Sequence, residues 1–500
     1  MQNQAASNLE SATIVIFGAS GDLTQRKLIP ALFNLYRKGG LPANIHIVGF
    51  ARRPYTHADF RARMRAGLDE FADEMEAGPL KEADVSTWDA FAANLWYVRG
   101  DLDTRSDYED LRARLREIEG RAGNRLYYLA TAPEFYIPIV EHLGALGMAM
   151  DTHGWRRVVV EKPFGHDLAS ARALNTAIHA VFDESQVYRI DHYLGKETAQ
   201  NVLFFRFANA IFEPVWNRRY VDHVQINVAE SVDIGHRAGY YEQAGVLRDM
   251  FQNHLLQLLT LVAIEPPVSF NANAVRNEKV KVLSAIPPIL FSDVVHAQYR
   301  GYRQVPGVEP DSCTPTYAAV KLFINNWRWQ GVPFYLRSGK ALAQKTSEIT
   351  IVFQRPPHLM FNMPPNHRLT PNILSLCMQP DEGIHLKFQT KVPGSAQAMG
   401  SVDMKFHYRS SFEGALPDAY ERLLLDALLG DASLFARSDE IELAWQLVDP
   451  LTCICESPDG PPLAIYDPGS WGPSEADDFM QRDGRAWGQA CAEYNMTADD

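Results

Sequence analysis

The stretch Arg189-Ile-Asp-His-Tyr-Leu-Gly-Lys196 carries two cations, a carboxylate, an imidazole and a phenol within eight residues. A site that holds a phosphorylated, hydroxyl-rich ligand and also moves a proton needs this mixture of donors and acceptors. The alternative interpretation is a solvated helix start with Asp191 as the N-cap. Gly195 beside Lys196 opens the backbone at this point.

A second histidine competes with His192 for the role of general base. Residues Gly245 to Ile264 have the pattern of one helix, and His254 lies on its apolar stripe, so a core histidine is the alternative. Polar neighbours favour a functional role, because a half-buried imidazole near a carboxylate suits proton abstraction. Adjacent side chains such as Asp191 and His192 diverge, so Asp191 is better placed to orient a distant histidine. We therefore expect His254 as the base and His192 as a phosphate ligand. The polar neighbours of His254 are Asp249, Gln252 and Asn253.

The N-terminal part of the chain has the pattern of a dinucleotide-binding βαβ unit. Thr13–Phe17 reads as a buried strand, residues 28–36 as a helix and residues 45–49 as a second strand. Between the first strand and the helix lies a glycine turn whose backbone can approach a pyrophosphate. The turn departs from the usual G-x-G-x-x-G spacing, and its residues are Gly18, Ala19, Ser20, Gly21, Asp22 and Leu23.

The end of the second strand predicts the cofactor. It reads Gly49-Phe-Ala-Arg-Arg53 and has no acid before Asp59, so Arg52 can face a 2′-phosphate, assisted by Arg53. The alternative is two solvated arginines. Lys27, in the first helical turn, is a further phosphate candidate. This pattern favours NADP over NAD.

Three further runs, at residues 95–98, 126–130 and 158–160, read as strands of the same parallel sheet. The last of them ends in Glu161-Lys-Pro-Phe-Gly165. Lys162 thus stands at the carboxyl end of a parallel strand, where ligands bind, and the bond to Pro163 is a candidate cis peptide. The alternative for Lys162 is a charge on a loop at the sheet edge.

Residues after 190 predict a second domain of α+β type. Alternating patterns at 221–229, 317–324, 347–353, 384–388 and 402–408 favour a large, mainly antiparallel sheet with helices on one face. We expect an α/β Rossmann domain over 1–190, followed by a domain over 191–500 that binds substrate and forms a dimer. Phe334 to Lys340, together with Lys345, gives a basic loop at a glycine turn.

Composition limits the remaining possibilities. Five hundred residues exceed one hydrophobic core, and 46% hydrophobic with 22% charged residues is typical of a globular protein. A net charge of −13 argues against nucleic-acid and membrane-surface partners. The first ten residues lack the pattern of a signal peptide, and no apolar run is long enough to span a membrane.

The five cysteines have no zinc-site spacing, so we expect no metal ion, reduced thiols and a cytoplasmic location. Cys453 and Cys455 alternate along an apolar run, which predicts a strand.

Four motifs, in this order and spacing, resemble the glucose-6-phosphate dehydrogenase family, in its bacterial NADP-dependent form. The resemblance extends from about residue 13 to past Tyr420. The motifs are Gly18–Leu23, Glu161–Gly165, Arg189–Lys196 and Arg248-Asp-Met-Phe-Gln-Asn-His254.

The resemblance implies a role for each matching residue. Lys162 would contact both substrate and cofactor, and Tyr136 would lie at the cofactor. His254 would be the base and Asp191 its carboxylate partner. The sugar phosphate would be held by His192, Tyr193 and Lys196. The remaining substrate contacts would come from Glu230, Asp249, Lys340, Lys345 and Gln379.

The resemblance also implies the reaction, which is oxidation of glucose 6-phosphate at C1 to the lactone with NADP⁺, the first step of the oxidative pentose phosphate pathway. The enzyme would be a homodimer or homotetramer. Eukaryotic members carry a second, structural NADP site, but its basic positions are Thr346, Thr350 and Cys377 here, so we expect none. Two alternatives remain open: an oxidoreductase for another sugar or sugar phosphate, and a non-catalytic NADP-binding sensor.

Overall fold

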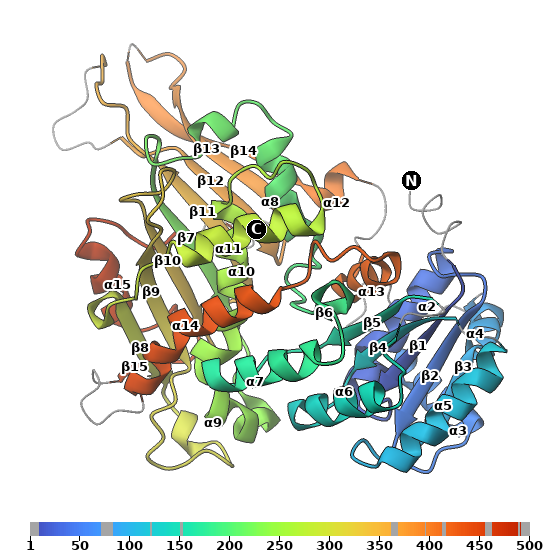
Figure 1. The fold of residues 1–500 in the computed structure, drawn as a ribbon. Coiled ribbons are helices and arrows are strands. Elements are labelled where there is room, and N and C mark those ends of the chain that lie inside the picture. Colours follow the sequence, from blue (N-terminus) through green and yellow to red (C-terminus); the bar gives the residue numbers. More distant parts are fainter. Residues whose placement is uncertain are drawn as a thin grey trace. The chain divides into compact units, whose positions relative to one another are not determined.

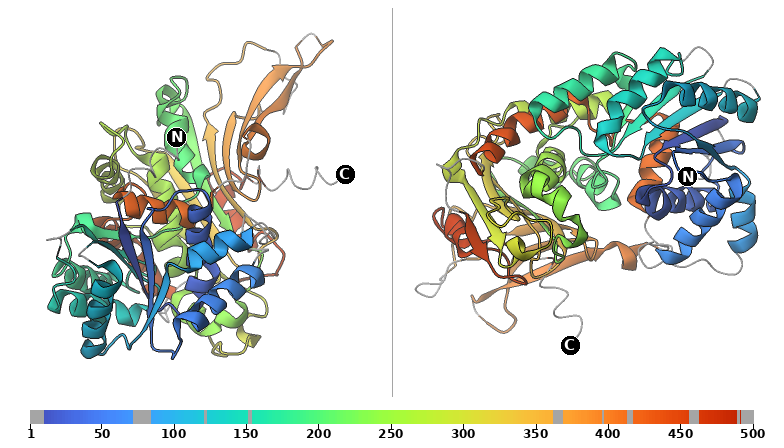
Figure 2. Two further views of the ribbon diagram at one scale, coloured as in Figure 1. Left: turned by 90° about the vertical axis from the view of Figure 1, so that its right-hand side faces the viewer. Right: turned by 90° about the horizontal axis from the view of Figure 1, so that it is seen from below.

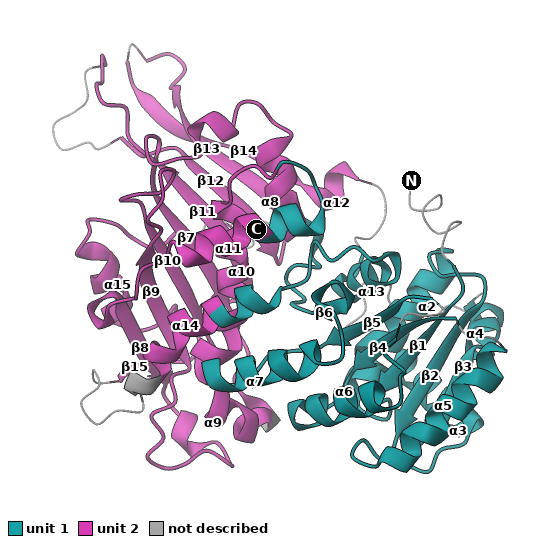
Figure 3. Cartoon of the chain, in the orientation of Figure 1, with its two compact units in different colours: residues 1–197, 268–276, 415–442 teal, residues 198–267, 277–414, 443–500 magenta. Residues whose placement is uncertain are grey.

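The computed structural model describes residues 10–71, 84–120, 123–150, 154–361, 369–395, 397–412, 417–455, 463–488 and 491. The chain divides into two compact units, coloured separately in Figure 3. Unit 1 comprises residues 1–197, 268–276 and 415–442, and unit 2 comprises residues 198–267, 277–414 and 443–500. Two segments from the second half of the sequence therefore belong to the N-terminal unit.

Unit 1 contains a six-stranded sheet in the order β3-β2-β1-β4-β5-β6, with every pair of neighbours parallel. This is the strand order of a dinucleotide-binding Rossmann fold, which confirms the predicted class. All residues of β1 are buried, as expected for a parallel strand covered on both faces. The strands are β1 (Ala12–Phe17), β2 (Ile45–Ala51), β3 (Leu95–Arg99), β4 (Asn124–Leu129), β5 (Arg156–Val160) and β6 (Val187–Arg189).

Helices cover both faces of this sheet (Figure 2). One row contains α2, α4 and α13, and the other contains α5, α6 and α7. Although α13 comes from the second half of the sequence, its Glu421 accepts hydrogen bonds from Lys38 at 2.6 Å and from Asn34 at 3.1 Å. The helices are α2 (Ile29–Arg37), α3 (His57–Glu70), α4 (Val85–Ala92), α5 (Arg105–Glu119), α6 (Tyr136–Ala145), α7 (Leu168–His179) and α13 (Ala419–Leu429).

Unit 2 is built on a nine-stranded sheet in the order β14-β13-β12-β11-β7-β10-β9-β8-β15 (Figure 1). Only the pairs β7–β10 and β8–β15 are parallel, so the predicted mainly antiparallel sheet is confirmed. The strands are β7 (Val221–Ala229), β8 (Val294–Tyr299), β9 (Tyr317–Phe323), β10 (Pro333–Gly339), β11 (Thr346–Phe353), β12 (Ile373–Gln379), β13 (Gly383–Lys391), β14 (Met399–His407) and β15 (Ala464–Tyr466).

The helix predicted from Gly245 to Ile264 is present over residues 247–263, but its first part is not α-helical. Gly245 has φ +58°, which interrupts the helix, and the nine residues after Val246 form a π-helix, η8 (Leu247–Leu255). The peptide N–H of Leu256 reaches the carbonyl of Phe251, five residues back, which is the π-type hydrogen bond. Regular α-helix resumes only in α10 (Leu256–Ala263).

The other α-helices in the described residues are α8 (Glu197–Phe207), α9 (Ala238–Val246), α11 (Ala272–Ser284), α12 (Tyr408–Ser411), α14 (Ser438–Cys455) and α15 (Ser474–Gln481). Because α14 continues to Cys455, the predicted strand at Cys453 and Cys455 is wrong. Within the described ranges, none of the helices has the length and apolar character needed to cross a membrane.

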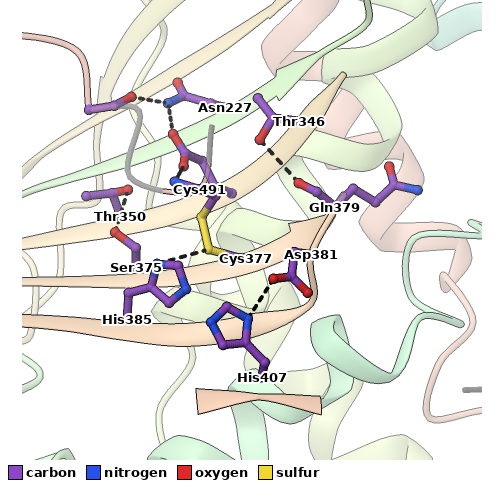
Figure 4. Close-up of a disulfide and its surroundings, with 12 residues drawn as sticks. Asn227, Thr346, Thr350, Ser375, Cys377, Gln379, Asp381, His385, His407 and Cys491 are labelled. Carbon is purple, nitrogen blue, oxygen red and sulfur yellow. Dashed lines mark hydrogen bonds and ion pairs between the residues drawn. A yellow bond between two sulfur atoms is a disulfide. The ribbon is translucent and has the colours of Figure 1, made fainter. Parts of the chain in front are cut away.

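The expectation of reduced thiols is also wrong, because Cys377 and Cys491 form a disulfide (Figure 4). Cys377 lies on β12, and Cys491 lies in the segment that follows α15. The peptide N–H of Cys491 donates to Glu348 at 3.0 Å, and Asn227 donates to the other oxygen of the same carboxylate at 3.0 Å. The disulfide attaches the end of the described chain to β12, and the hydrogen bond of Cys491 attaches it to β11.

Candidate active site

The predicted glycine turn lies at the carboxyl end of β1. Gly18 has φ +80°, and a Cβ atom there would lie 2.3 Å from the carbonyl oxygen of Ala130. The N–H of Gly21 closes the turn on the carbonyl of Gly18 at 2.9 Å. Glycine at position 18 therefore lets the turn pass close to the end of β4. The chain then enters the helical segment formed by η1 (Thr24–Leu28) and α2. This geometry fits a pyrophosphate held by backbone N–H groups.

Arg52 and Arg53 follow β2 directly and are both exposed. The peptide N–H of Gly18 donates to Phe50 at 2.9 Å, so the end of β2 and the glycine turn share one edge of the sheet. Tyr97 donates to the carbonyl of Arg53 at 2.7 Å and fixes the backbone there. Lys27 lies in η1 and is half-buried. The two arginine side chains are therefore available at the edge where a 2′-phosphate would bind.

Lys162 lies immediately after β5, and the Lys162–Pro163 bond is cis, which confirms that expectation. Tyr136, at the start of α6, is 1% exposed, and its hydroxyl donates to the carbonyl of Glu161 at 3.1 Å. Tyr136 thus contacts the backbone that precedes Lys162, a contact that the sequence did not predict.

The stretch from Arg189 to Lys196 is mostly buried, and only His192 and Lys196 are half-buried. Arg189 is 1% exposed and is bound by Glu184 at 2.8 Å and Asn175 at 3.0 Å, so its charge serves the fold of unit 1. Asp191 is 2% exposed and accepts from the peptide N–H of Tyr193 at 3.0 Å. Since α8 begins only at Glu197, the interpretation of Asp191 as its N-cap is wrong.

The three predicted phosphate ligands lie together in unit 1. The Nζ atom of Lys196 is 4.1 Å from the centre of the Tyr193 ring, a cation–π distance. The rings of His192 and Tyr193 are 4.9 Å apart. Gly195 gives this group its shape, because a Cβ atom there would lie 2.7 Å from the carbonyl of Ala419 at the start of α13.

In unit 2, three predicted substrate residues form one cluster. Glu230 follows β7 and Lys340 follows β10, and since these strands are parallel neighbours their ends coincide. Lys340 forms an ion pair with Glu230 and lies 3.7 Å from a carboxylate oxygen of Asp249. The hydroxyl of Tyr240 donates to the other oxygen of Asp249 at 3.1 Å, and burial, followed by the charge of Asp249, raises the Tyr240 pKa and keeps it a donor. Sequence reasoning missed Tyr240, which no local motif marks.

His254 is 1% exposed and belongs to η8, five residues after Asp249. Five residues is the hydrogen-bond period of a π-helix, and such segments are frequent at functional sites. The π conformation, which the sequence pattern concealed, thus carries both the predicted base and a predicted sugar ligand. His254 belongs to unit 2, whereas Asp191 belongs to unit 1.

The remaining predicted substrate residues lie at the start of β11 and the end of β12. Lys345 is exposed on the loop before β11, and Gln379 ends β12. The hydroxyl of Thr346 donates to the carbonyl of Gln379 at 3.2 Å, so the two strand ends are joined (Figure 4).

A cavity of about 940 Å³ opens elsewhere in unit 2, between several strands of the sheet and residues 483–488. None of the predicted substrate residues lines it.

The fold and these residues together define a dinucleotide-binding oxidoreductase. Two profiles of one family match nearly the whole chain: "Glucose-6-phosphate dehydrogenase, NAD binding domain" over residues 15–201 and "Glucose-6-phosphate dehydrogenase, C-terminal domain" over residues 203–488. The chain belongs to the glucose-6-phosphate dehydrogenase family. Enzymes of this family use NADP.

Curated relatives agree with this assignment over nearly their full length. Glucose-6-phosphate 1-dehydrogenase of Chlamydia muridarum is 43% identical over 95% of this chain and 96% of its own. The Bacillus subtilis enzyme of the same name is 41% identical over 95% of this chain and 98% of its own.

A solved structure titled "Glucose-6-phosphate dehydrogenase in complex with its substrate glucose-6-phosphate" superimposes with a TM-score of 0.89 at 37% identity. It covers 96% of this chain and 99% of its own. The X-ray structure of glucose-6-phosphate 1-dehydrogenase from Mycobacterium avium has a TM-score of 0.82 at 36% identity, with coverage of 96% and 99%.

Proposed function

We propose that the chain oxidises D-glucose 6-phosphate at C1 to 6-phospho-D-glucono-1,5-lactone and uses NADP⁺ as the hydride acceptor. The observation that carries this proposal is the cluster of the buried residues Lys340 and Asp249 with the half-buried Glu230. Alternating carboxylates and an ammonium can accept from and donate to the several hydroxyls of a hexose. The relatives named above support the substrate, since one of their structures is titled as its complex.

The proposed mechanism gives each predicted residue a stated role. His254 removes the proton from the C1 hydroxyl, and Asp191 holds its imidazole and stabilises the cation that forms. His192, Tyr193 and Lys196 bind the phosphate, and this binding at a distance positions C1 for reaction. Lys162 contacts substrate and cofactor, Glu230 and Asp249 bind sugar hydroxyls, and Lys340, Lys345 and Gln379 complete the substrate contacts.

NADP⁺, when bound, supplies the hydride acceptor. The residues of the glycine turn, Gly18 to Leu23, suit its pyrophosphate because Gly18 leaves space that a Cβ atom would fill. Arg52, with Arg53 and Lys27, binds the 2′-phosphate or neighbouring phosphates, and Tyr136 is assigned to the cofactor. We further propose a homo-oligomeric enzyme in the cytoplasm that works without a metal ion.

The test is a deuterium-transfer assay. Glucose 6-phosphate labelled with deuterium at C1 is incubated with the chain and NADP⁺, and both products are examined by NMR. The expected result is deuterium on the nicotinamide ring together with the phosphogluconolactone or its hydrolysis product. Equal kcat/KM for unphosphorylated glucose would instead favour a different sugar oxidoreductase, and absence of any turnover would favour a cofactor sensor.

A further inference from the structure

A buried carboxylate next to Lys162 has no part in the mechanism above. Glu161 is 8% exposed and lies between β5 and the Lys162–Pro163 bond. Burial raises the pKa of its carboxyl, while hydrogen bonds from Tyr128 and Tyr420 and the charge of Lys162 oppose the rise. A carboxyl kept in the interior is costly unless hydrogen-bond donors surround it, so its donors are informative.

Three donors from separate parts of unit 1 converge on this carboxylate. The hydroxyl of Tyr128, on β4, donates to Oε1 of Glu161 at 2.6 Å. The hydroxyl of Tyr420, on α13, donates to it as well, and so does the peptide N–H of Lys162. Tyr420 belongs to the segment that returns to unit 1 from the second half of the sequence.

The peptide group that joins Glu161 to Lys162 is held at both of its polar atoms. Its carbonyl oxygen accepts from the buried hydroxyl of Tyr136 at 3.1 Å. Its N–H donates to the Glu161 carboxylate. The next residue is Pro163, which has no N–H to donate. The contacts of Glu161 therefore fix the backbone from which the Lys162 side chain projects.

We propose that Glu161, held by Tyr128 and Tyr420, is a positioning residue that aims Lys162 for the reaction. The proposal rests on the proposed function, because it requires Lys162 to contact substrate and cofactor. A carboxylate can accept at both oxygens, whereas glutamine would turn an NH₂ group towards groups that only donate here. Glu161→Gln thus disrupts the hydrogen bonds around this carboxylate while the volume of the side chain hardly changes.

The chain offers a matched control one residue away. Tyr127 lies next to Tyr128 on β4, is equally buried, and donates its hydroxyl to the carbonyl of Met148 at 2.8 Å. Tyr127→Phe and Tyr128→Phe each remove one buried hydroxyl from the same strand, but only Tyr128 contacts Glu161. A role in folding alone predicts similar effects of the two changes.

The experiment measures kcat, both KM values and the Tm of Glu161→Gln, Tyr128→Phe, Tyr420→Phe and Tyr127→Phe. We expect Glu161→Gln to lower kcat roughly 10–100-fold and each of Tyr128→Phe and Tyr420→Phe about 3–10-fold, because small displacements of a reacting group slow catalysis strongly. Tyr127→Phe should leave kcat within about twofold while lowering Tm as much as Tyr128→Phe does. Equal kcat for Tyr127→Phe and Tyr128→Phe would overturn the proposal.

A double-mutant cycle with Lys162→Met separates positioning from stability. If Glu161 acts through Lys162, then Glu161→Gln causes no further loss of kcat/KM in the Lys162→Met background. If Glu161→Gln does not fold, Tyr420→Phe takes its place in the cycle. If the losses of kcat/KM from the two substitutions multiply in the double variant, the positioning role is overturned and the proposed function is left intact. Near-normal kcat of Lys162→Met alone would instead remove Lys162 from the mechanism, and the positioning role with it.

Discussion

The Nζ atom of Lys340 lies 3.7 Å from the Oδ2 atom of Asp249 and is also paired with Glu230. One ammonium group thus joins the end of β7, the end of β10 and the π-helix η8. Lys340 is only 6% exposed, so water screens these charges little. The geometry of the three candidate sugar-binding residues therefore depends on Lys340.

Lys340→Met should raise the KM for glucose 6-phosphate roughly 10–100-fold, because it leaves two carboxylates facing each other without their shared cation. Steady-state kinetics against glucose 6-phosphate at saturating NADP⁺ gives this value. Lys321→Met is the control, since Lys321 also pairs with two carboxylates of unit 2, Asp293 at 3.0 Å and Asp483 at 3.3 Å. An unchanged KM for Lys340→Met would mean that the cluster does not bind the sugar.

His254→Asn should lower kcat by roughly 10²–10⁴-fold and change substrate affinity little, which is the range for loss of a general base. Affinity is measured by equilibrium binding of glucose 6-phosphate, apart from turnover. The control is His296→Asn, because His296 is another buried histidine of unit 2 and lies on β8. Near-normal turnover of His254→Asn would exclude His254 as the base.

The structural elements that could be predicted from the sequence are those that local residue patterns encode. Residue period and turn chemistry gave the βαβ unit around Gly18, the strand after which Lys162 stands, and most strands of the second sheet. The roles of Glu230 and Lys340 came from the family resemblance alone, and their meeting at the ends of the parallel neighbours β7 and β10 is known only from the structure. Long-range pairings have no local pattern, which is why the donation from Tyr420 to Glu161 and the Cys377–Cys491 bond were missed. The π-helix was missed for a different reason: Leu247, Phe251 and Leu258 satisfy an α-helical stripe as well.

Arg52→Ala should raise the KM for NADP⁺ much more than the KM for NAD⁺, since only NADP⁺ carries the 2′-phosphate. The ratio of kcat/KM for the two cofactors should fall about 10–100-fold, which corresponds to loss of one charge-assisted contact. Arg61→Ala is a suitable control, because Arg61 donates to the backbone carbonyls of Leu95 and Ala93 in the same unit. Equal changes for both cofactors would contradict the assignment of Arg52.

Loss of the Cys377–Cys491 disulfide should lower the free energy of unfolding by roughly 3–5 kcal/mol, since it closes a loop with a sequence separation of 114 residues. Urea unfolding with and without a dithiol reductant measures the effect. The double variant Cys377→Ser/Cys491→Ser should be insensitive to reductant, whereas Cys313→Ser, which changes an exposed free thiol, should behave as the parent does. A parent chain whose unfolding ignores the reductant would contradict the role of this bond.

The buried histidine of β8 should make stability depend on acidity below neutral pH. Burial lowers the pKa of His296 from 6.5 to about 4. Between these values the unfolded chain binds a proton that the folded chain does not, so the free energy of unfolding falls as the pH decreases from 6.5 towards 4. In full, this proton linkage lowers the free energy of unfolding by about 3.5 kcal/mol, since each pKa unit corresponds to about 1.4 kcal/mol. His296→Gln should remove this group's part of the decrease in the free energy of unfolding between pH 6.5 and 4. Above pH 6.5 this proton linkage should contribute to the stability of neither parent nor variant. Urea unfolding of parent and variant at several pH values makes the comparison, and parallel curves between pH 6.5 and 4 would show that His296 does not carry the linkage.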